Sequence, residues 1–277
     1  MIITVTCSVP LSKEKPLTSR LFKAGAMSVT RTAQGSGVML EIIADEMSAE
    51  MLTDLCAPYA PVTAVLEEKD WVNEWAKDFT GIEAAPGIMI IPENVEYHGQ
   101  AETVIRIDPR DAFGAGTHPT TRICCGAIKT LLIDGQYQAG ASSFLDIGTG
   151  TGVLAILSFL FGMHRIDAFD IEAPSVERAK YNALINGCAD IAFTCCGIDT
   201  FKCGTPYDIV CANVNSVIIE TYFTHILSFA AAGGILILSG IGVQWADSME
   251  QLFAEHSLML CEKHECDGWL GYILKKP

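Results

Sequence analysis

The feature that most constrains the fold is a glycine-rich turn in the middle of the chain. Ser143 to Ile147 is a mostly apolar run that predicts a strand, and Gly148, Gly150 and Gly152 follow at alternate positions. A helical pattern starts at Val153. Glycines permit tight turns and let a ligand approach the main chain closely. A strand, a glycine turn and a helix in this order predict a nucleotide-type site, although a purely structural turn is an alternative.

An acidic residue at the end of the next predicted strand supports the binding interpretation. Asp170 ends the run that begins at Ile166, and it lies 18 residues beyond Gly152. A carboxylate at this place can accept hydrogen bonds from both ribose hydroxyls of a nucleoside. The alternative is that Asp170 only caps the helix that follows it.

Three features favour S-adenosylmethionine over a nicotinamide dinucleotide as the ligand. The glycines follow a Gly-x-Gly-x-Gly spacing, whereas dinucleotide sites use Gly-x-Gly-x-x-Gly. Asp146 stands just before the first glycine, where an acid can hold the donor's amino group or order the loop. The turn occurs only in mid-chain, after a predicted helix from Thr117 to Leu132 that could close over the cofactor.

Two domains are expected. Residues 1–66 show the order β-α-β-β-α-β, which is typical of a small ferredoxin-like α+β domain. Residues 67–92 are expected to be a linker. Residues 93–277 mostly alternate strands with helices, which predicts an α/β domain with a mostly parallel, doubly wound sheet. Two final strands, Leu258 to Cys266 and Trp269 to Lys275, indicate an antiparallel pair at one edge of this sheet.

Two smaller predictions concern the region between the domains. Trp71, Trp75 and Phe79 recur at a spacing of four, which predicts a helix in the linker. Ile88 to Ile91 and Thr103 to Ile107 are expected to be strands of a hairpin that introduces the second domain.

The charge balance favours some partners over others. The chain has 33 acidic and 18 basic side chains and a formal net charge of −15. Affinity for nucleic acid comes largely from Lys and Arg on phosphates, so no direct nucleic-acid specificity is expected. A basic protein would be attracted to such a surface.

Cysteine usage and hydropathy indicate the cellular setting. Several of the 11 cysteines sit inside apolar segments, which is typical of reduced core thiols in a cytoplasmic protein. The longest apolar stretch, Val153 to Phe161, is too short to span a bilayer, and no secretory signal is visible. We expect a cytoplasmic protein without membrane association. No metal site is expected, because the ligands in Cys261 to Cys266 lack a second ligand pair.

A second motif lies upstream of the glycine turn. It runs from Asp108 to Thr121 as Asp-Pro-Arg-Asp-Ala-Phe-Gly-Ala-Gly-Thr-His-Pro-Thr-Thr. This motif closely resembles the signature of the PrmA family, the bacterial methyltransferases of ribosomal protein L-eleven. The resemblance continues through Leu145 to Ile156 and Phe169 to Glu172, and it covers about residues 70 to 245. It implies a Rossmann-like, seven-stranded class I methyltransferase domain behind a ferredoxin-like substrate-recognition domain.

The resemblance also implies site residues. Four positions match the family's main contacts to S-adenosylmethionine: Thr120, Gly148, Asp170 and Asn213. Asn213 would also lie near the donor methyl and the incoming amine, which makes it the candidate catalytic residue. Further donor contacts are expected from Asp146, Gly150, Ile171, Phe113, Thr117 and His118. Structural alternatives stay open: His118 and the threonines could serve only a helix start, and Asn213 a turn.

The chemistry of methyl transfer fits these residue types. The reaction is an in-line displacement that needs no metal, so positioning carries most of the catalysis. The nucleophile must be a neutral amine, and desolvation near a cationic sulfonium helps a lysine to lose its proton. The carbonyl of Asn213 could accept a hydrogen bond from this amine and aim its lone pair.

The acceptor is the more open question. The family usually continues after the asparagine with an apolar pair, whereas here Val214, Asn215 and Ser216 follow. The leading hypothesis is N-methylation of lysine side chains and/or the α-amine of ribosomal protein L-eleven. The alternatives are another protein, a small molecule, or a donor-binding module without turnover. Methylation of nucleic-acid bases is disfavoured, because the Asn-Pro-Pro-aromatic motif is absent.

Overall fold

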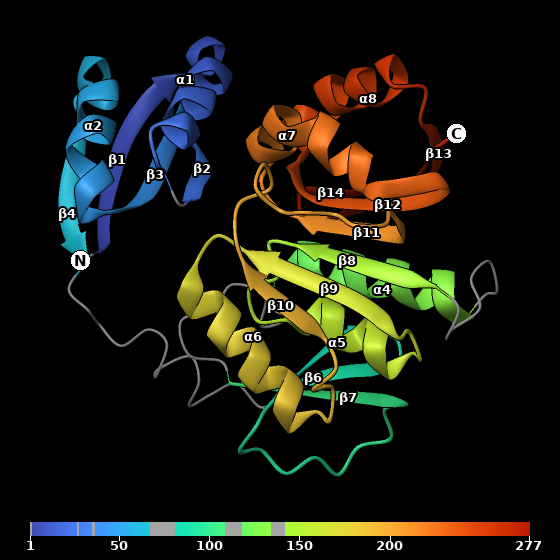
Figure 1. The fold of residues 1–277 in the computed structure, drawn as a ribbon. Coiled ribbons are helices and arrows are strands. Elements are labelled where there is room, and N and C mark those ends of the chain that lie inside the picture. Colours follow the sequence, from blue (N-terminus) through green and yellow to red (C-terminus); the bar gives the residue numbers. More distant parts are fainter. Residues whose placement is uncertain (1, 27, 35–36, 67–80, 109–117, 134–141) are drawn as a thin grey trace. The chain divides into compact units, whose positions relative to one another are not determined.

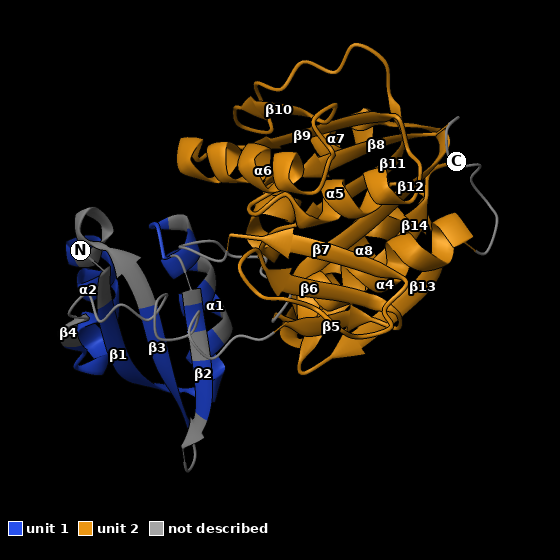
Figure 2. Ribbon diagram, turned by 90° about the horizontal axis from the view of Figure 1, so that it is seen from below, with its two compact units in different colours: residues 1–71 blue, residues 72–277 orange. Residues whose placement is uncertain are grey.

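The chain divides into two compact units, residues 1–71 and residues 72–277 (Figure 2). The computed structural model describes residues 2–26, 28–34, 37–66, 81–108, 118–133 and 142–277. The helix predicted around Trp71 and Trp75 lies outside these residues, as does most of the predicted linker. The predicted domain boundaries stay a prediction.

The first unit has the predicted order of elements. They are β1 (Ile2–Pro10), α1 (Leu11–Lys23), β2 (Ser28–Gln34), β3 (Gly37–Asp45), α2 (Glu46–Cys56), the 3-10 turn η1 (Ala57–Tyr59) and β4 (Val62–Leu66). The strands form an antiparallel sheet in the order β2-β3-β1-β4. Alternate residues of β1 and β3, among them Val5 and Leu40, pack against Leu21 of α1 and Leu52 of α2. The ferredoxin-like prediction is confirmed.

The second unit contains two sheets. Its elements are β5 (Ile82–Ala85), β6 (Ile88–Pro92), β7 (Thr103–Ile107), α4 (Pro119–Ile133), β8 (Ser143–Ile147), α5 (Val153–Leu160), β9 (Arg165–Asp170), α6 (Ala173–Ile185), β10 (Ala192–Cys195), β11 (Tyr207–Asn213), α7 (Ser216–Phe229), β12 (Ala230–Gly242), η2 (Val243–Trp245), α8 (Ala246–Glu255), β13 (Met259–Cys266) and β14 (Trp269–Lys275).

The larger sheet has seven strands in the order β10-β9-β8-β11-β12-β14-β13. The strands from β10 to β12 are parallel, and β14 pairs antiparallel with β12 and with β13. This confirms the doubly wound sheet and its antiparallel edge pair. The strand order reverses at β8, so the carboxyl ends of β8, β9 and β11 meet where such sheets bind ligands.

Both faces of the large sheet are covered, as Figure 1 shows. Helices α4, α5 and α6 lie on one face, and α7 and α8 lie on the other. Successive strand residues point to opposite faces of the sheet. Phe144 therefore packs in the core beneath α4 and α5, and Leu145 packs in the core beneath α7 and α8. Both side chains are fully buried. Burial on both faces explains why the parallel strands are almost continuously apolar.

The smaller sheet corrects one prediction. Strands β6 and β7 pair parallel to each other, so the predicted hairpin between them is wrong. The antiparallel partner of β6 is β5, joined to it through Pro86 and Gly87, where glycine takes a φ of 76° (Figure 2). Strand β5 was not predicted because its sequence, Ile-Glu-Ala-Ala, has a weak strand propensity. Residues 82–92, expected to be linker, therefore form a hairpin of the second unit.

Gly240 in β12 provides a test of how closely β12 packs against the main chain of Val214. Gly240 lies at a register shift between β12 and β14 with a φ of 85°, and an added Cβ would lie 2.2 Å from the carbonyl oxygen of Val214. We expect Gly240→Ala to lower the free energy of unfolding by more than about 3 kcal/mol, because backbone strain and overlap add. The matched control is Gly233→Ala, which has a φ of 72° but open space around the added Cβ. Urea unfolding of both variants should separate the overlap from the strain, and equal losses would contradict the prediction.

Candidate functional site

The glycine turn is held against the end of the neighbouring strand. The amides of Gly148 and Thr149 both donate to the carbonyl oxygen of Phe169, at 2.9 and 3.0 Å. Gly148, Gly150 and Gly152 have φ values of 69°, 53° and 82°, a region that favours glycine. This conformation exposes main-chain groups to a ligand at the carboxyl end of the sheet.

Asp170 fixes the same turn from the end of β9. Its Oδ2 accepts a hydrogen bond from the amide of Gly150 at 3.0 Å, and its Oδ1 accepts one from the amide of Glu172 at 3.0 Å. Each carboxylate oxygen has a second lone pair, so the half-buried side chain can still accept from two hydroxyls. Asp170 thus both caps the following segment and keeps its capacity to bind ribose.

Asp146 lies beneath the turn and is almost fully buried. The hydroxyl of Thr149 donates to its Oδ2 at 2.7 Å, which shows that Asp146 orders the loop. Burial raises the pKa of Asp146 to about 7, although this hydrogen bond opposes the shift. The main-chain amide of Ala155 also bonds this carboxyl and likewise opposes the shift in its pKa.

Asn213 ends β11 beside the turn. Its Nδ2 donates to the hydroxyl of Thr121 at 3.4 Å, which ties the strand to the first turn of α4. Its Oδ1 is buried and lacks a partner in the described part of the chain. An unsatisfied buried carbonyl costs about 1–3 kcal/mol, so this oxygen is a ready acceptor for a donor brought by a ligand.

The first turn of α4 supplies His118 and Thr120. Pro119 begins the helix, where its missing N–H is not needed, and the carbonyl oxygen of His118 accepts from the amide of Arg122. The ring Nδ1 of His118 bonds the hydroxyl of the fully buried Thr120 at 2.7 Å. Burial lowers the pKa of His118, which favours the neutral ring. Both residues therefore serve the helix start and lie beside Thr121, the partner of Asn213.

Trp269 joins this group and was missed by the sequence analysis. Its ring meets that of His118 edge to face, with the centroids 4.8 Å apart. Trp269 begins β14, which runs antiparallel to β12 from the edge where the parallel strands end. The sequence feature that could have indicated its position is the Asp267-Gly268 pair, which is typical of a two-residue hairpin turn. The structure confirms the turn with φ values of 50° and 80°, and the turn places Trp269 at the end of the sheet where the parallel strands finish.

The polar sequence after Asn213 has a structural cause. The side chain of Asn215 accepts a hydrogen bond from the amide of Ile218 at 3.0 Å and caps α7. Asn215 therefore serves the helix, and Val214 is the residue of this loop that borders the glycine turn.

The predicted site residues fall into three sets. Asp146, Gly148, Gly150 and Asp170 are linked by hydrogen bonds around the ends of β8 and β9. Asn213, His118 and Thr120 gather at the end of β11 and the start of α4. Ile171 is 75 % exposed directly after Asp170, so its side chain is open to a ligand. Phe113 and Thr117 lie outside the described residues.

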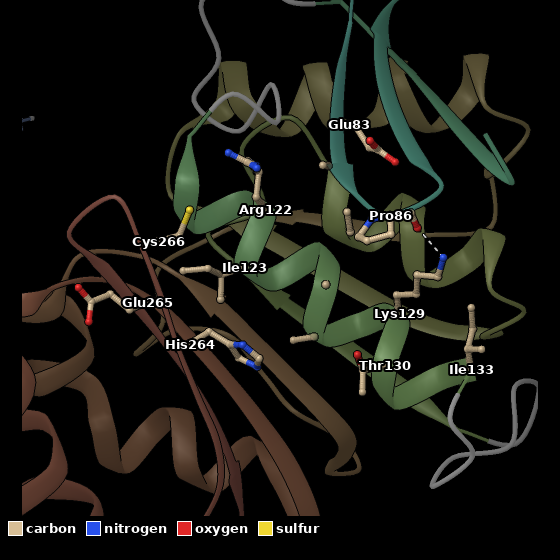
Figure 3. Close-up of a pocket in the computed structure, with 14 residues that line it drawn as sticks. Glu83, Pro86, Arg122, Ile123, Lys129, Thr130, Ile133, His264, Glu265 and Cys266 are labelled. Atoms are coloured by element: carbon tan, nitrogen blue, oxygen red, sulfur yellow. Dashed lines mark hydrogen bonds between the residues drawn. The ribbon is translucent and has the colours of Figure 1, made fainter. Parts of the chain in front are cut away.

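A cavity of about 640 Å³ elsewhere in the second unit contains none of these residues. It lies between α4, the β5–β6 hairpin and β13, and Figure 3 shows its lining. The amine of Lys129 there donates to the carbonyl oxygen of Pro86 and pairs with Glu102, so this charge is already satisfied. Among the described residues, no cluster of His, Cys, Asp or Glu could hold a metal ion. No helix in the described ranges is long and apolar enough to cross a membrane.

The sheet order, the glycine turn and the acid at the end of the next strand define a Rossmann-like class I methyltransferase. More specifically, the chain belongs to the PrmA family, described as ribosomal protein L11 methyltransferase, whose model matches residues 38–277.

Relatives and a solved structure agree with this assignment. The chain is 32% identical over 226 residues to the ribosomal protein L11 methyltransferase of Geotalea uraniireducens, covering 78% of this chain and 71% of the relative. It is 35% identical over 219 residues to that of Citrifermentans bemidjiense, covering 78% and 70%. A crystal structure of ribosomal protein L11 methylase from Lactobacillus delbrueckii subsp. bulgaricus superposes with a TM-score of 0.63 at 27% identity, covering 72% of this chain and all of that one.

The buried carboxyl of Asp146 predicts a pH dependence. Its pKa rises from 3.8 to about 7 on folding, so its contribution to stability is full below pH 3.8 and is lost as the pH rises through 7. We expect the stability of the wild type, relative to Asp146→Asn, to fall between about pH 4 and 7 and to level off above. Urea unfolding of both proteins across this range measures the difference, and a difference that does not change with pH would contradict the assignment.

Proposed function

We propose that this protein transfers methyl groups from S-adenosylmethionine to amines of ribosomal protein L11, on lysine side chains and/or the α-amine. The observation that carries the proposal is the buried Oδ1 of Asn213, which has no hydrogen-bond partner among the described residues and lies at the same carboxyl end of the sheet as the glycine turn and Asp170. Family membership and the names of the relatives support the substrate.

The donor side of the site fits S-adenosylmethionine. When bound, this group supplies a methyl on a cationic sulfonium, which is a good leaving group. Asp170 would accept from the ribose hydroxyls, because both of its oxygens retain a lone pair. Gly148 and Gly150 would bring the main chain close to the donor, with Thr120 and the exposed Ile171 as further contacts.

The acceptor side orients an amine. Asn213 Oδ1 would accept one hydrogen bond from the neutral amine and direct its lone pair toward the methyl. The lysine releases its proton to solvent before transfer, and desolvation near the sulfonium favours this release. His118 and Trp269 form an aromatic pair next to Thr121 and Asn213, where they would exclude water from the amine.

Charge and domain organisation fit a protein substrate. The net charge of −15 attracts a basic ribosomal protein and disfavours direct binding to RNA. Residues 1–66 lie in a separate compact unit, which would recognise the substrate. A ribosomal protein as substrate implies that the enzyme works in the cytoplasm.

The acceptor is tested with a labelled methyl donor on ribosomal subunits and on isolated ribosomal proteins. We expect label in L11, and Asn213→Ala should lower kcat about 100-fold because the amine loses its orienting partner. The affinity of this variant for L11 should stay close to that of the wild type. Label in RNA, or in no protein, would overturn the proposed substrate.

The donor is tested by calorimetry with S-adenosylmethionine. Asp170→Ala removes hydrogen bonds to a charged acceptor, each typically about 1.5–3 kcal/mol, so the Kd should rise about 10- to 100-fold. Asp190→Ala, which removes an exposed acid before β10, is the control and should leave the Kd unchanged. Binding of NAD in place of S-adenosylmethionine, or an unaffected Asp170→Ala, would contradict the assignment.

A further inference from the structure

A fully buried amide on α6 joins two segments of the proposed site. Asn182 Oδ1 accepts a hydrogen bond from the main-chain amide of Asp108 at 2.8 Å. Its Nδ2 donates to the main-chain carbonyl oxygen of Thr151, also at 2.8 Å. Both contacts are to main chain, so they fix backbone positions whatever side chains stand there.

The two partners belong to different motifs of the site. Thr151 lies between Gly150 and Gly152 in the glycine turn that shapes the donor side. Asp108 follows β7 and begins the motif that ends with the first turn of α4, where Thr120 lies. The side chain of Asn182 forms a hydrogen-bonded bridge between them, across 31 and 74 residues of sequence.

Helix α6 also packs directly on the turn. An added Cβ at Gly152 would lie 3.0 Å from the Cβ of Ala179, one helical turn before Asn182. The helix therefore meets the glycine turn at two points, and Asn182 is the one that extends the contact to Asp108.

Asn186, the residue that ends α6, provides an internal comparison. Its Oδ1 accepts from the amide of Arg106 at 2.8 Å, and its Nδ2 donates to the carbonyl oxygen of the same residue. Asn186 thus holds strand β7, two residues before Asp108, with the same chemistry, and its side chain bonds Arg106 and Asn182 and not the glycine turn.

We propose that Asn182 is a positioning residue for the methyl donor, which holds the glycine turn against Asp108 at the end of β7. The proposed donor contacts of Gly148 and Gly150 belong to the turn that Asn182 fixes through Thr151. A turn whose position is fixed in advance loses less freedom when the donor binds, so the donor binds more tightly. This inference rests on the proposed donor site.

The test compares two conservative variants, Asn182→Asp and Asn186→Asp. Each carboxylate keeps the acceptor for a main-chain amide but cannot donate, so Asn182→Asp loses the bond to Thr151 and places a negative charge against its carbonyl oxygen. The full-length proteins are compared by calorimetry with S-adenosylmethionine, by thermal unfolding, and by kcat and KM for donor and for L11.

We expect Asn182→Asp to raise the Kd and the KM for the donor about tenfold, the size expected for a lost hydrogen bond with a buried partner. Its kcat at saturating donor and its KM for L11 should stay within about twofold of the wild type. Asn186→Asp should lose thermal stability to a similar degree while keeping the donor Kd of the wild type.

The outcomes separate this inference from the proposed function. If the wild type does not bind S-adenosylmethionine, the proposed donor site fails. If the wild type binds and both variants show the same donor Kd, Asn182 is a structural residue only and the inference is overturned. Should Asn182→Asp not fold, Asn182→Ala removes both side-chain hydrogen bonds without adding a charge, and an unchanged donor Kd there would also overturn the inference.

Discussion

The site depends on the carbonyl oxygen of Phe169, which accepts from two successive amides of the glycine turn. This oxygen can take both bonds only because β8 and β9 pair in parallel, with Ile147 opposite Phe169. These two hydrogen bonds hold the glycine turn next to the end of β9, so that the side chain of Asp170 can reach the amide of Gly150. A shift of one residue in this register would turn Asp170 to the other face of the sheet and separate the two.

Much of this arrangement could be predicted from the sequence. The glycine spacing, Asp146 and Asp170 are local patterns whose geometry follows from a strand, a turn and a helix, and the structure brings them together. The apolar strands were found because they are buried on both faces. Strand β5 was missed because Ala84 and Ala85 favour no strand, although both are buried against α4.

Contacts between distant segments could not be predicted in this way. The pairing of β6 with β7 depends on a long connection whose direction no local pattern specifies. Asn182 bonds two main-chain groups that lie 31 and 74 residues away, and an asparagine within a helix carries no mark of such partners. The polar run after Asn213 is another example, because no local pattern shows that the side chain of Asn215 caps α7. The residue type shows which hydrogen bonds a side chain can make, and its partner depends on which segments the fold brings beside it.

Val214 stands between two glycines from different parts of the chain. An added Cβ on Gly148 would lie 2.7 Å from its Cγ1, and one on Gly240 would lie 2.2 Å from its carbonyl oxygen. Val214 directly follows Asn213, so the loop proposed to meet the acceptor packs directly on the turn proposed to meet the donor. A larger residue at position 214 that changed the proposed acceptor entrance would therefore also press on the glycine turn.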